Sequence, residues 1–248
     1  MLSTVTPDEA LKISAAAFGG LRTPAESCPL AEALGRVLAE DIESPEYVPG
    51  FDRSSVDGYA VAAADTFGCS ESSPALLRLR GRVEMGRAPE FALAPGECAA
   101  IPTGGRLPEG ADAAVMLEYS EDYGGGLIGL TKSAAPGQNV VFRGDDAAPG
   151  RAVLRAGRRL RAADIGALAA MGITEPAVRR RPLVGILSTG DELVPPDRVP
   201  GPGEVRDVNA PMLCALVRGC GGEPVELGIV RDEIEALDAA VGGALERC

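Results

Sequence analysis

The sequence predicts a multidomain protein of mixed α+β and α/β class. A helical and β linker domain carries an inserted β-rich domain and is followed by the start of a doubly wound domain. Helix signals open the chain, short strands separated by Gly and Pro fill its middle, and apolar strands alternate with amphipathic helices near its end. The expected domains are 1–48 with 147–180 for the discontinuous linker domain, 49–146 for the insert and 181–248 for an incomplete α/β domain.

The first helix of the linker domain is expected to begin after Thr6. Thr6 can cap the helix, Pro7 suits its first turn, and Glu9 completes a capping box. The proline-punctuated segment 44–50 is typical of an extended linker and marks a domain boundary.

Two more helices complete the expected linker domain. One spans about 30–39, and the other spans 164–171, where Asp164 suits the positive end of the helix dipole. The residues expected to face inward from the helix at 30–39 are Leu34, Val37 and Leu38. The insert is expected to hold short strands over 59–61, 76–79, 98–101, 113–117 and 127–130.

The last segment predicts the order strand, helix, strand, helix. The apolar run 183–187 is typical of a strand buried on both faces. A helix over about 209–218 with Asn209 as its N-cap, a strand over 225–230 and a helix over 232–247 follow. In such doubly wound domains, ligands bind at the carboxyl ends of the strands.

Composition excludes several function classes. The net charge is −12, which argues against binding to nucleic acid or to anionic membranes, because polyanions attract basic surfaces. The chain has no histidine, so it cannot hold a Ser-His-Asp triad, a Cys-His nucleophile or a His-ligated zinc of its own. Acid–base work would fall to Asp, Glu, Lys or Tyr.

The cysteines and the first residues indicate a cytoplasmic protein. None of the six cysteines forms a Cys-x-x-Cys motif, so we expect buried, reduced thiols rather than a zinc ribbon or a redox motif. Asp8 and Glu9 stand where a signal peptide needs positive charge, and no apolar run approaches 18 residues.

Five short polar motifs are candidates for chemistry, although each alone has a plain structural interpretation as a turn or a cap. Carboxylates after strands can hold Mg²⁺, and a Thr-Gly-Gly turn can present amides and a hydroxyl to an anion. The motifs are Arg53-Ser54-Ser55-Val56-Asp57-Gly58-Tyr59-Ala60, Ile101-Pro102-Thr103-Gly104, Arg143-Gly144-Asp145-Asp146, Ser188-Thr189-Gly190-Asp191-Glu192-Leu193 and Asp207-Val208-Asn209.

Arginines also gather between 151 and 181. They can attract an anion, or they can be solvated side chains at strand edges, and the sequence leaves both interpretations open. The residues are Arg151, Arg155, Arg158, Arg159, Arg161, Arg179, Arg180 and Arg181.

Taken in order, the motifs resemble the molybdopterin molybdenumtransferase family, the MoeA-like proteins that include the C-terminal domain of gephyrin. A further matching piece is Pro108-Glu109-Gly110-Ala111-Asp112-Ala113. The resemblance covers nearly the whole chain. It implies that the α/β domain binds molybdopterin. It also implies a homodimer that inserts molybdate into adenylylated molybdopterin and releases AMP, with Mg²⁺ or another divalent cation.

The resemblance also implies roles for individual residues. The cleft would lie between the β-rich domain of one subunit and the α/β domain of the other. The expected catalytic residues are Asp57, Thr103, Asp146 and Glu192. The expected metal ligands are Asp57, Asp146 and Glu192. The residues expected to bind the cofactor are Ser54, Gly104, Asp207 and Asn209.

The sequence also departs from the family pattern. The family's α/β domain continues with a third strand and a Ser-Gly-Gly-x-Ser-x-Gly loop that contacts the pterin phosphate, and neither occurs in these 248 residues. We therefore expect the 248 residues alone not to complete insertion. The alternative function is a dimeric, non-catalytic binding or scaffold module of the same family. Other proteins of molybdenum cofactor biosynthesis are further expected partners.

Overall fold

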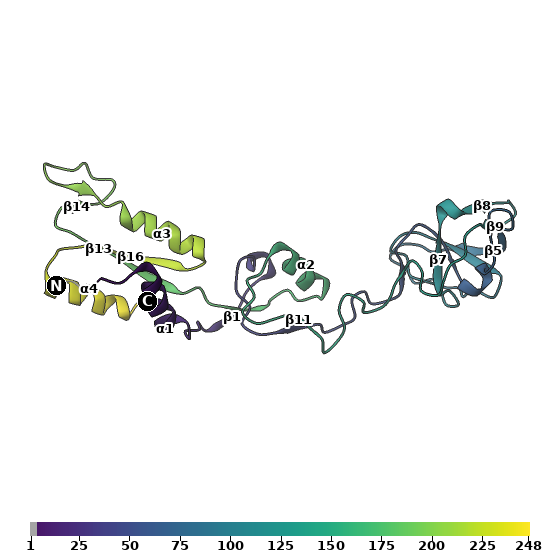
Figure 1. Ribbon diagram of the computed structural model, residues 1–248, viewed down its shortest axis with the longest axis horizontal. Helices are drawn as coiled ribbons and strands as arrows, with labels where there is room; N and C mark the ends of the chain where they lie inside the picture. The colour runs from purple at the N-terminus through teal and green to yellow at the C-terminus, as the bar shows by residue number, and fades with distance from the viewer. Residues whose placement is uncertain (1–3) are drawn as a thin grey trace. The chain divides into compact units, whose positions relative to one another are not determined.

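The computed structural model describes residues 4–248, which form two compact units (Figure 1). One unit is residues 42–153, called the β-rich unit below. The other joins the residues up to 41 with residues 154–248. Among residues 4–248, no helix combines the length and the apolar character that crossing a membrane requires.

The β-rich unit is built on a six-stranded sheet of order β7-β4-β6-β5-β9-β8. Neighbouring strands are antiparallel except β5 and β6, which are parallel. The strands are β4 (Gly58–Val61), β5 (Ala75–Arg82), β6 (Glu97–Ile101), β7 (Ala113–Met116), β8 (Ser120–Asp122) and β9 (Leu127–Leu130). The short 3₁₀ helices are η2 (Ala63–Thr66) and η3 (Leu117–Tyr119). The five predicted strands of the insert are therefore present, and β8 is added.

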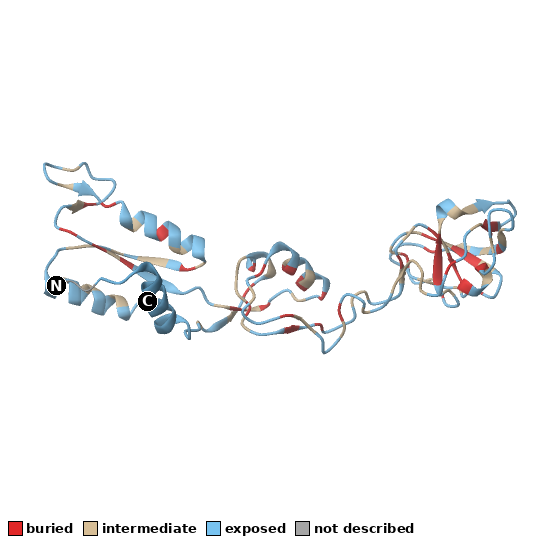
Figure 2. Cartoon of the chain, viewed as in Figure 1, coloured by how far each residue is buried: buried red, intermediate tan, exposed pale blue. Residues whose placement is uncertain are grey.

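The core of this unit lies against the sheet (Figure 2). Its fully buried members include Val61, Cys98 and Leu130. The buried Thr66 hydroxyl donates to the Ala63 carbonyl at 2.8 Å and accepts from the Ala134 amide at 2.9 Å, so it costs no unpaired polar group. Short strand pairs extend the unit, formed by β2 (Ile42–Glu43) with β11 (Ala152–Leu154) and by β3 (Arg53–Ser54) with β10 (Val140–Val141).

Burial of Cys98 predicts a thiol that does not react. Loss of hydration raises the pKa of the Cys98 thiol to about 12, and the thiolate is the nucleophilic form. In the native protein at pH 8, iodoacetamide is expected to modify the exposed Cys220 and Cys248 and to leave Cys98 unmodified. Peptide mass spectrometry measures this directly. Modification of Cys98 at the same rate as Cys248 would contradict the described packing.

The other unit begins with α1 (Pro7–Phe18), whose predicted capping box is confirmed. The Glu9 amide donates to Thr6 Oγ1 at 3.3 Å, and Glu9 Oε2 accepts from the Thr6 amide at 2.8 Å. Next come β1 (Ala25–Ser27) and η1 (Leu30–Glu32), and later α2 (Ala162–Ala170) and β12 (Ala177–Arg179). β1 pairs with β12, so segments about 150 residues apart lie side by side, as a discontinuous linker domain requires.

The predicted helix over 30–39 is wrong. Only the turn η1 forms, Gly35 then takes a φ of 76°, and Leu34 is 61% exposed instead of facing inward. The chain from Val37 to Ala39 is extended and exchanges backbone hydrogen bonds with 157–158 and 177–179. Pairing with distant segments therefore outweighs the local helix propensity of this stretch.

The last segment has the predicted order strand, helix, strand, helix. It holds β13 (Leu183–Thr189), α3 (Asn209–Cys220), β16 (Glu223–Val230) and α4 (Ile234–Leu245), and the small pair β14 (Leu193–Val194) and β15 (Val205–Arg206). β13 and β16 are parallel. Their register shifts by one residue at Leu227, where Ile186 faces Glu226 and Leu187 faces Gly228. The mixed α+β and α/β class is confirmed.

Two local predictions for this segment are wrong. β13 is not buried on both faces, because Leu183 and Val184 are 43% and 36% exposed. Asn209 is not the N-cap of α3 but its first helical residue. The carboxylate of Asp207 accepts from the amides of Asn209 and Ala210 instead, at 3.0 and 3.1 Å. An ionised carboxylate suits the positive end of the helix better than a neutral amide side chain.

Candidate functional site

The β-rich unit brings two of the predicted motifs together. Asp57 lies immediately before β4, and Thr103 lies two residues after the end of β6, the neighbouring strand. The Thr103 amide donates to Asp57 Oδ1 at 2.8 Å across 46 positions of sequence. The Gly104 amide donates to the Ser54 carbonyl at 2.7 Å. Both Asp57 and Thr103 remain exposed, so their side chains are accessible to a ligand.

Ser54 shapes the turn that presents Asp57. It is 1% exposed, and its hydroxyl donates to the Val56 carbonyl at 2.6 Å and accepts from the Val56 amide at 3.2 Å. Its hydrogen-bonding capacity is thus used within the protein. Asp57 itself lines a cavity of about 230 Å³, with Tyr59, Arg82 and Pro102 among its other walls.

Asp146 lies in the tight turn between Arg143 and Ala147. Its amide donates to the Val48 carbonyl at 2.9 Å, and its side chain is exposed. The guanidinium of Arg143 stacks 3.9 Å from the centre of the Tyr47 ring, and its amide donates to Asp52 Oδ1 at 2.7 Å. These contacts hold the turn against neighbouring backbone and side chains. No hydrogen bond or ion pair joins Asp146 to Asp57.

The other unit holds a cavity of about 560 Å³, called the strand-end cavity below. It lies where β13 and β16 end and α3 begins. Its walls are Gly190, Asp191, Leu193, Pro195, Pro196, Asp207, Ala210, Pro211, Glu226, Gly228, Ile229 and Arg231. This is the edge at which parallel sheets of doubly wound domains bind ligands.

Asp207 is the buried acidic group of the strand-end cavity, with an exposed fraction of 4%. A hydrogen bond from the Ser188 side chain and those from the two α3 amides hold the pKa of Asp207 below its ordinary value, against the opposing effect of burial. These hydrogen bonds therefore favour the ionised form of the Asp207 carboxyl group and hold its position at the start of α3. Asn209 is exposed beside it.

Glu192 lies next to the strand-end cavity and is exposed. Its backbone carbonyl accepts from the Val205 amide at 2.8 Å, which ties the motif to β15. Its carboxylate folds over Gly190, because a Cβ on Gly190 would lie 2.7 Å from Glu192 Oε2. Gly190 thus leaves room for this carboxylate.

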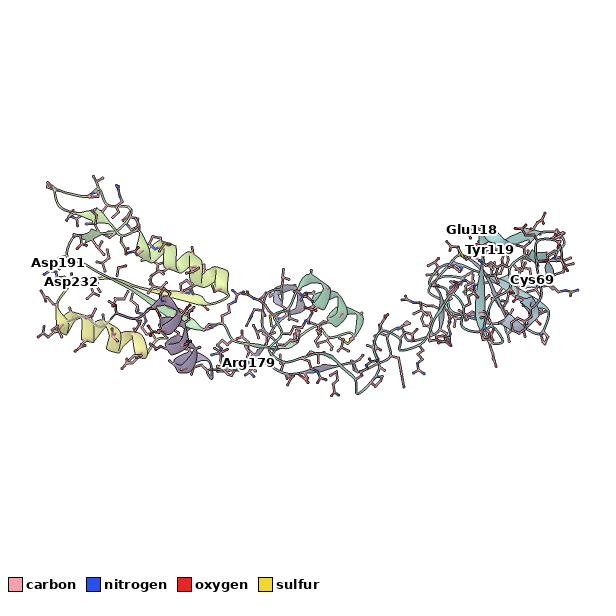
Figure 3. The ribbon with its side chains drawn as sticks, in the orientation of Figure 1. Cys69, Glu118, Tyr119, Arg179, Asp191 and Asp232 are labelled. Atoms are coloured by element: carbon pink, nitrogen blue, oxygen red, sulfur yellow. The ribbon has the colours of Figure 1, made fainter. Side chains whose placement is uncertain are left out.

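Two acidic residues to which the sequence analysis assigned no role lie at this edge, although Asp191 belongs to one of the predicted motifs. Asp191 and Asp232 each lie two residues beyond the paired residues Thr189 and Val230, and both are labelled in Figure 3 at this end of the two strands. Asp191 lines the strand-end cavity. The sequence could have placed both residues here, because residues that follow two neighbouring parallel strands meet at one edge of the sheet.

The predicted metal ligands do not form a metal centre within either unit. Asp57 and Asp146 belong to the β-rich unit, whereas Glu192 belongs to the other. Among the described residues, no group of three His, Cys, Asp or Glu side chains is placed to hold a metal ion. The described residues of a single unit therefore offer no all-protein cage for a cation, whereas Mg²⁺ commonly uses one or two carboxylates together with water and phosphate oxygens.

Comparison with known proteins gives a consistent result over most of the chain. Residues 5–172 match a family described as MoeA N-terminal region (domain I and II), and residues 185–248 match one described as Probable molybdopterin binding domain. A Molybdopterin molybdenumtransferase of Bacillus subtilis is 37% identical over 221 residues, and one of Nostoc sp. is 38% identical over 213 residues. These alignments cover 88% and 86% of this chain and 51% and 49% of the relatives. The chain spans about half the length of the curated relatives it matches.

Solved structures agree. The crystal structure of a molybdopterin biosynthesis MoeA protein from Pyrococcus horikoshii OT3 has a TM-score of 0.89 and 36% identity, and covers 99% of this chain and 65% of that one. Another MoeA structure from Pyrococcus horikoshii has a TM-score of 0.82 and 40% identity, and the match covers 98% of this chain and 62% of that one.

Proposed function

Because the chain belongs to the MoeA family of molybdopterin molybdenumtransferases, we propose that it acts in molybdenum cofactor biosynthesis by inserting molybdate into adenylylated molybdopterin with release of AMP. The strand-end cavity carries this proposal. It has the volume of a small-molecule site, and it lies at the ligand-binding edge of a parallel sheet.

The residues of the cavity suggest how the substrate would be placed. Arg231 is the one basic residue among the described walls, beside Asp191, Asp207 and Glu226. A phosphate or molybdate anion would therefore be oriented toward Arg231 and away from the carboxylates. Such orientation contributes to catalysis because it converts a bimolecular encounter into a fixed geometry.

The β-rich unit would supply the second half of the site. We propose a homodimer in which Asp57, Thr103 and Asp146 of one subunit face Glu192 of the other. This arrangement would explain why the four residues do not come together within either unit. The division into a linker domain (1–48 with 147–180), an insert (49–146) and an α/β domain (181–248) belongs to the same proposal and is supported by the pairing of β1 with β12.

Dependence of the reaction on Mg²⁺ is also part of the proposal. A cation would supply charge neutralisation between the phosphate and molybdate oxygens. Its carboxylate ligands would come from Asp57, Asp146 and Glu192, together with phosphate oxygens of the substrate.

Blocking the strand-end cavity tests the proposal. Ala210 lines it from the first turn of α3, whereas Met212 on the same helix is 59% exposed and does not line it. Ala210→Trp is expected to weaken binding of adenylylated molybdopterin at least about tenfold, and Met212→Trp is the matched control. Equilibrium dialysis measures how much adenylylated molybdopterin each variant retains. Release of AMP in the same samples measures turnover, and the comparison with and without EDTA measures its dependence on metal. A wild-type chain that retains no pterin, or a blocked variant that retains it equally, would contradict the proposal.

The proposed homodimer has a separate test. Sedimentation velocity at micromolar concentration is expected to give a species of about twice the chain mass of 25.4 kDa. A single 25.4 kDa species over the same concentration range would remove the basis for a cleft shared between subunits.

A further inference from the structure

Six arginines line a cavity of about 770 Å³ that the proposed reaction does not use, called the arginine cavity below. They are Arg22, Arg36, Arg159, Arg179, Arg180 and Arg181. No Asp or Glu belongs to its described walls, although the chain as a whole has a net charge of −12. We propose that this cavity binds a phosphorylated small molecule of about the size of a mononucleotide. The inference does not depend on the proposed function.

Backbone carbonyls hold four of the six guanidinium groups in place, those of Arg22, Arg36, Arg159 and Arg179. Arg179, labelled in Figure 3, donates to the Thr23 and Ala39 carbonyls, each at 3.1 Å. Arg159 donates to the Gly35 and Cys220 carbonyls, also at 3.1 Å. Carbonyl acceptors fix the orientation of a guanidinium without neutralising its charge. Each guanidinium has five N–H donors, so donors remain for a ligand.

The positive charge of the cavity is only partly balanced. Among residues 4–248, Glu26 is the one carboxylate that forms ion pairs with these arginines, with Arg36 and, at 3.5 Å, with Arg180. Arg181 makes no ion pair and no side-chain hydrogen bond within the same residues. A concave surface lined by charges of one sign concentrates its field and attracts the opposite ion. The planar fork of arginine fits phosphate oxygens in pairs.

The remaining walls indicate more than a bare ion. Leu21, Pro24, Val37 and Pro182 contribute apolar surface, and the volume lies in the range of small-molecule pockets. A ligand that combines phosphate with a planar or apolar group uses both kinds of wall. Nucleotides and phosphorylated pterins share this chemistry, and the experiment separates them.

The test compares two double variants that remove the same charge. Arg180→Gln with Arg181→Gln changes the cavity at exposed side chains whose guanidiniums do not hold the backbone. Arg78→Gln with Arg80→Gln changes exposed arginines of β5, outside the cavity. Calorimetry with ATP and with neopterin monophosphate in 0.1 M salt is expected to show that at least one binds. The cavity variant should bind it at least about tenfold more weakly and the control within about twofold. The ligand that binds more tightly shows whether the arginine cavity prefers a nucleotide or a phosphorylated pterin.

Two readouts locate the binding. Cys220 lines the arginine cavity and is exposed, as is Cys248 outside it, so the bound ligand should slow iodoacetamide modification of Cys220 but not of Cys248. Ala210→Trp, which blocks the strand-end cavity, should leave this binding unchanged. The proposal is overturned if neither ligand binds below 1 mM, if both double variants weaken binding equally, if Cys220 is not protected, or if Ala210→Trp abolishes binding.

Discussion

Replacing Gly58 with alanine is expected to lower the free energy of unfolding of the β-rich unit by about 3 kcal/mol or more. A Cβ at this position would lie 1.9 Å from the Val115 carbonyl oxygen and 2.9 Å from the Leu117 amide nitrogen. Both atoms belong to backbone that pairs with β4 or its flanking turn, so no side chain can move aside. The strand must separate from β7, and the turn that presents Asp57 moves with it.

Urea unfolding, followed by a probe within the β-rich unit, measures the effect. Gly50→Ala is the matched control, because the nearest atom to its added Cβ, the Tyr47 carbonyl oxygen, lies at an ordinary 3.8 Å. The control is expected to stay within about 0.5 kcal/mol of wild type. Equal stability of the two variants would show that β4 and β7 are not packed as described.

Replacing Asp207 with alanine is expected to destabilise the α/β segment by about 2–4 kcal/mol. The change removes the buried acceptor for two α3 amides, those of Asn209 and Ala210. Asp191→Ala is the control, since Asp191 is an exposed neighbour on the same cavity. Hydrogen exchange at the amides of Asn209 and Ala210 reports the cap directly, and unchanged protection in Asp207→Ala would contradict this account.

The same carboxylate predicts a dependence on pH. The pKa of Asp207 is lower in the folded than in the unfolded chain, so the folded state favours the ionised form. This contribution is fully present above the unfolded pKa of about 4, and it is lost as the pH falls through the folded pKa. Asp207→Asn should therefore lose less stability than wild type between pH 5 and pH 2 in acid titrations. Identical acid sensitivity would exclude this linkage.

Local chemistry explains which elements could be predicted. The α1 cap depends on residues three positions apart, and the short strands of the insert are bounded by their own turn residues, so the sequence nearby was enough. The stretch 30–39 depends instead on backbone partners more than 100 residues away, which no local pattern reveals. The exposure of Leu183 likewise depends on what packs against the sheet.

The candidate site shows the same division. The motifs were identifiable as polar turns after strands, but the bond from the Thr103 amide to Asp57 arises only because β4 and β6 are neighbours. Asp207 was expected to bind the cofactor, and the structure adds that it caps α3. Asp232 follows β16 and could have been placed by the same rule, but the sequence there was interpreted only as the start of a helix.

The extra residue in β16 also has a consequence for how this protein can be altered. Side chains alternate between the two faces of a strand, and the bulge at Leu227 absorbs the extra residue, so that the residues from Gly228 onward stay paired with those of β13 from Leu187 onward. Deleting Leu227 would remove the bulge and leave this pairing in place, so Arg231 would stay at the strand-end cavity. Variants that shorten β16 at Leu227 are therefore expected to keep the same residues on the walls of the strand-end cavity.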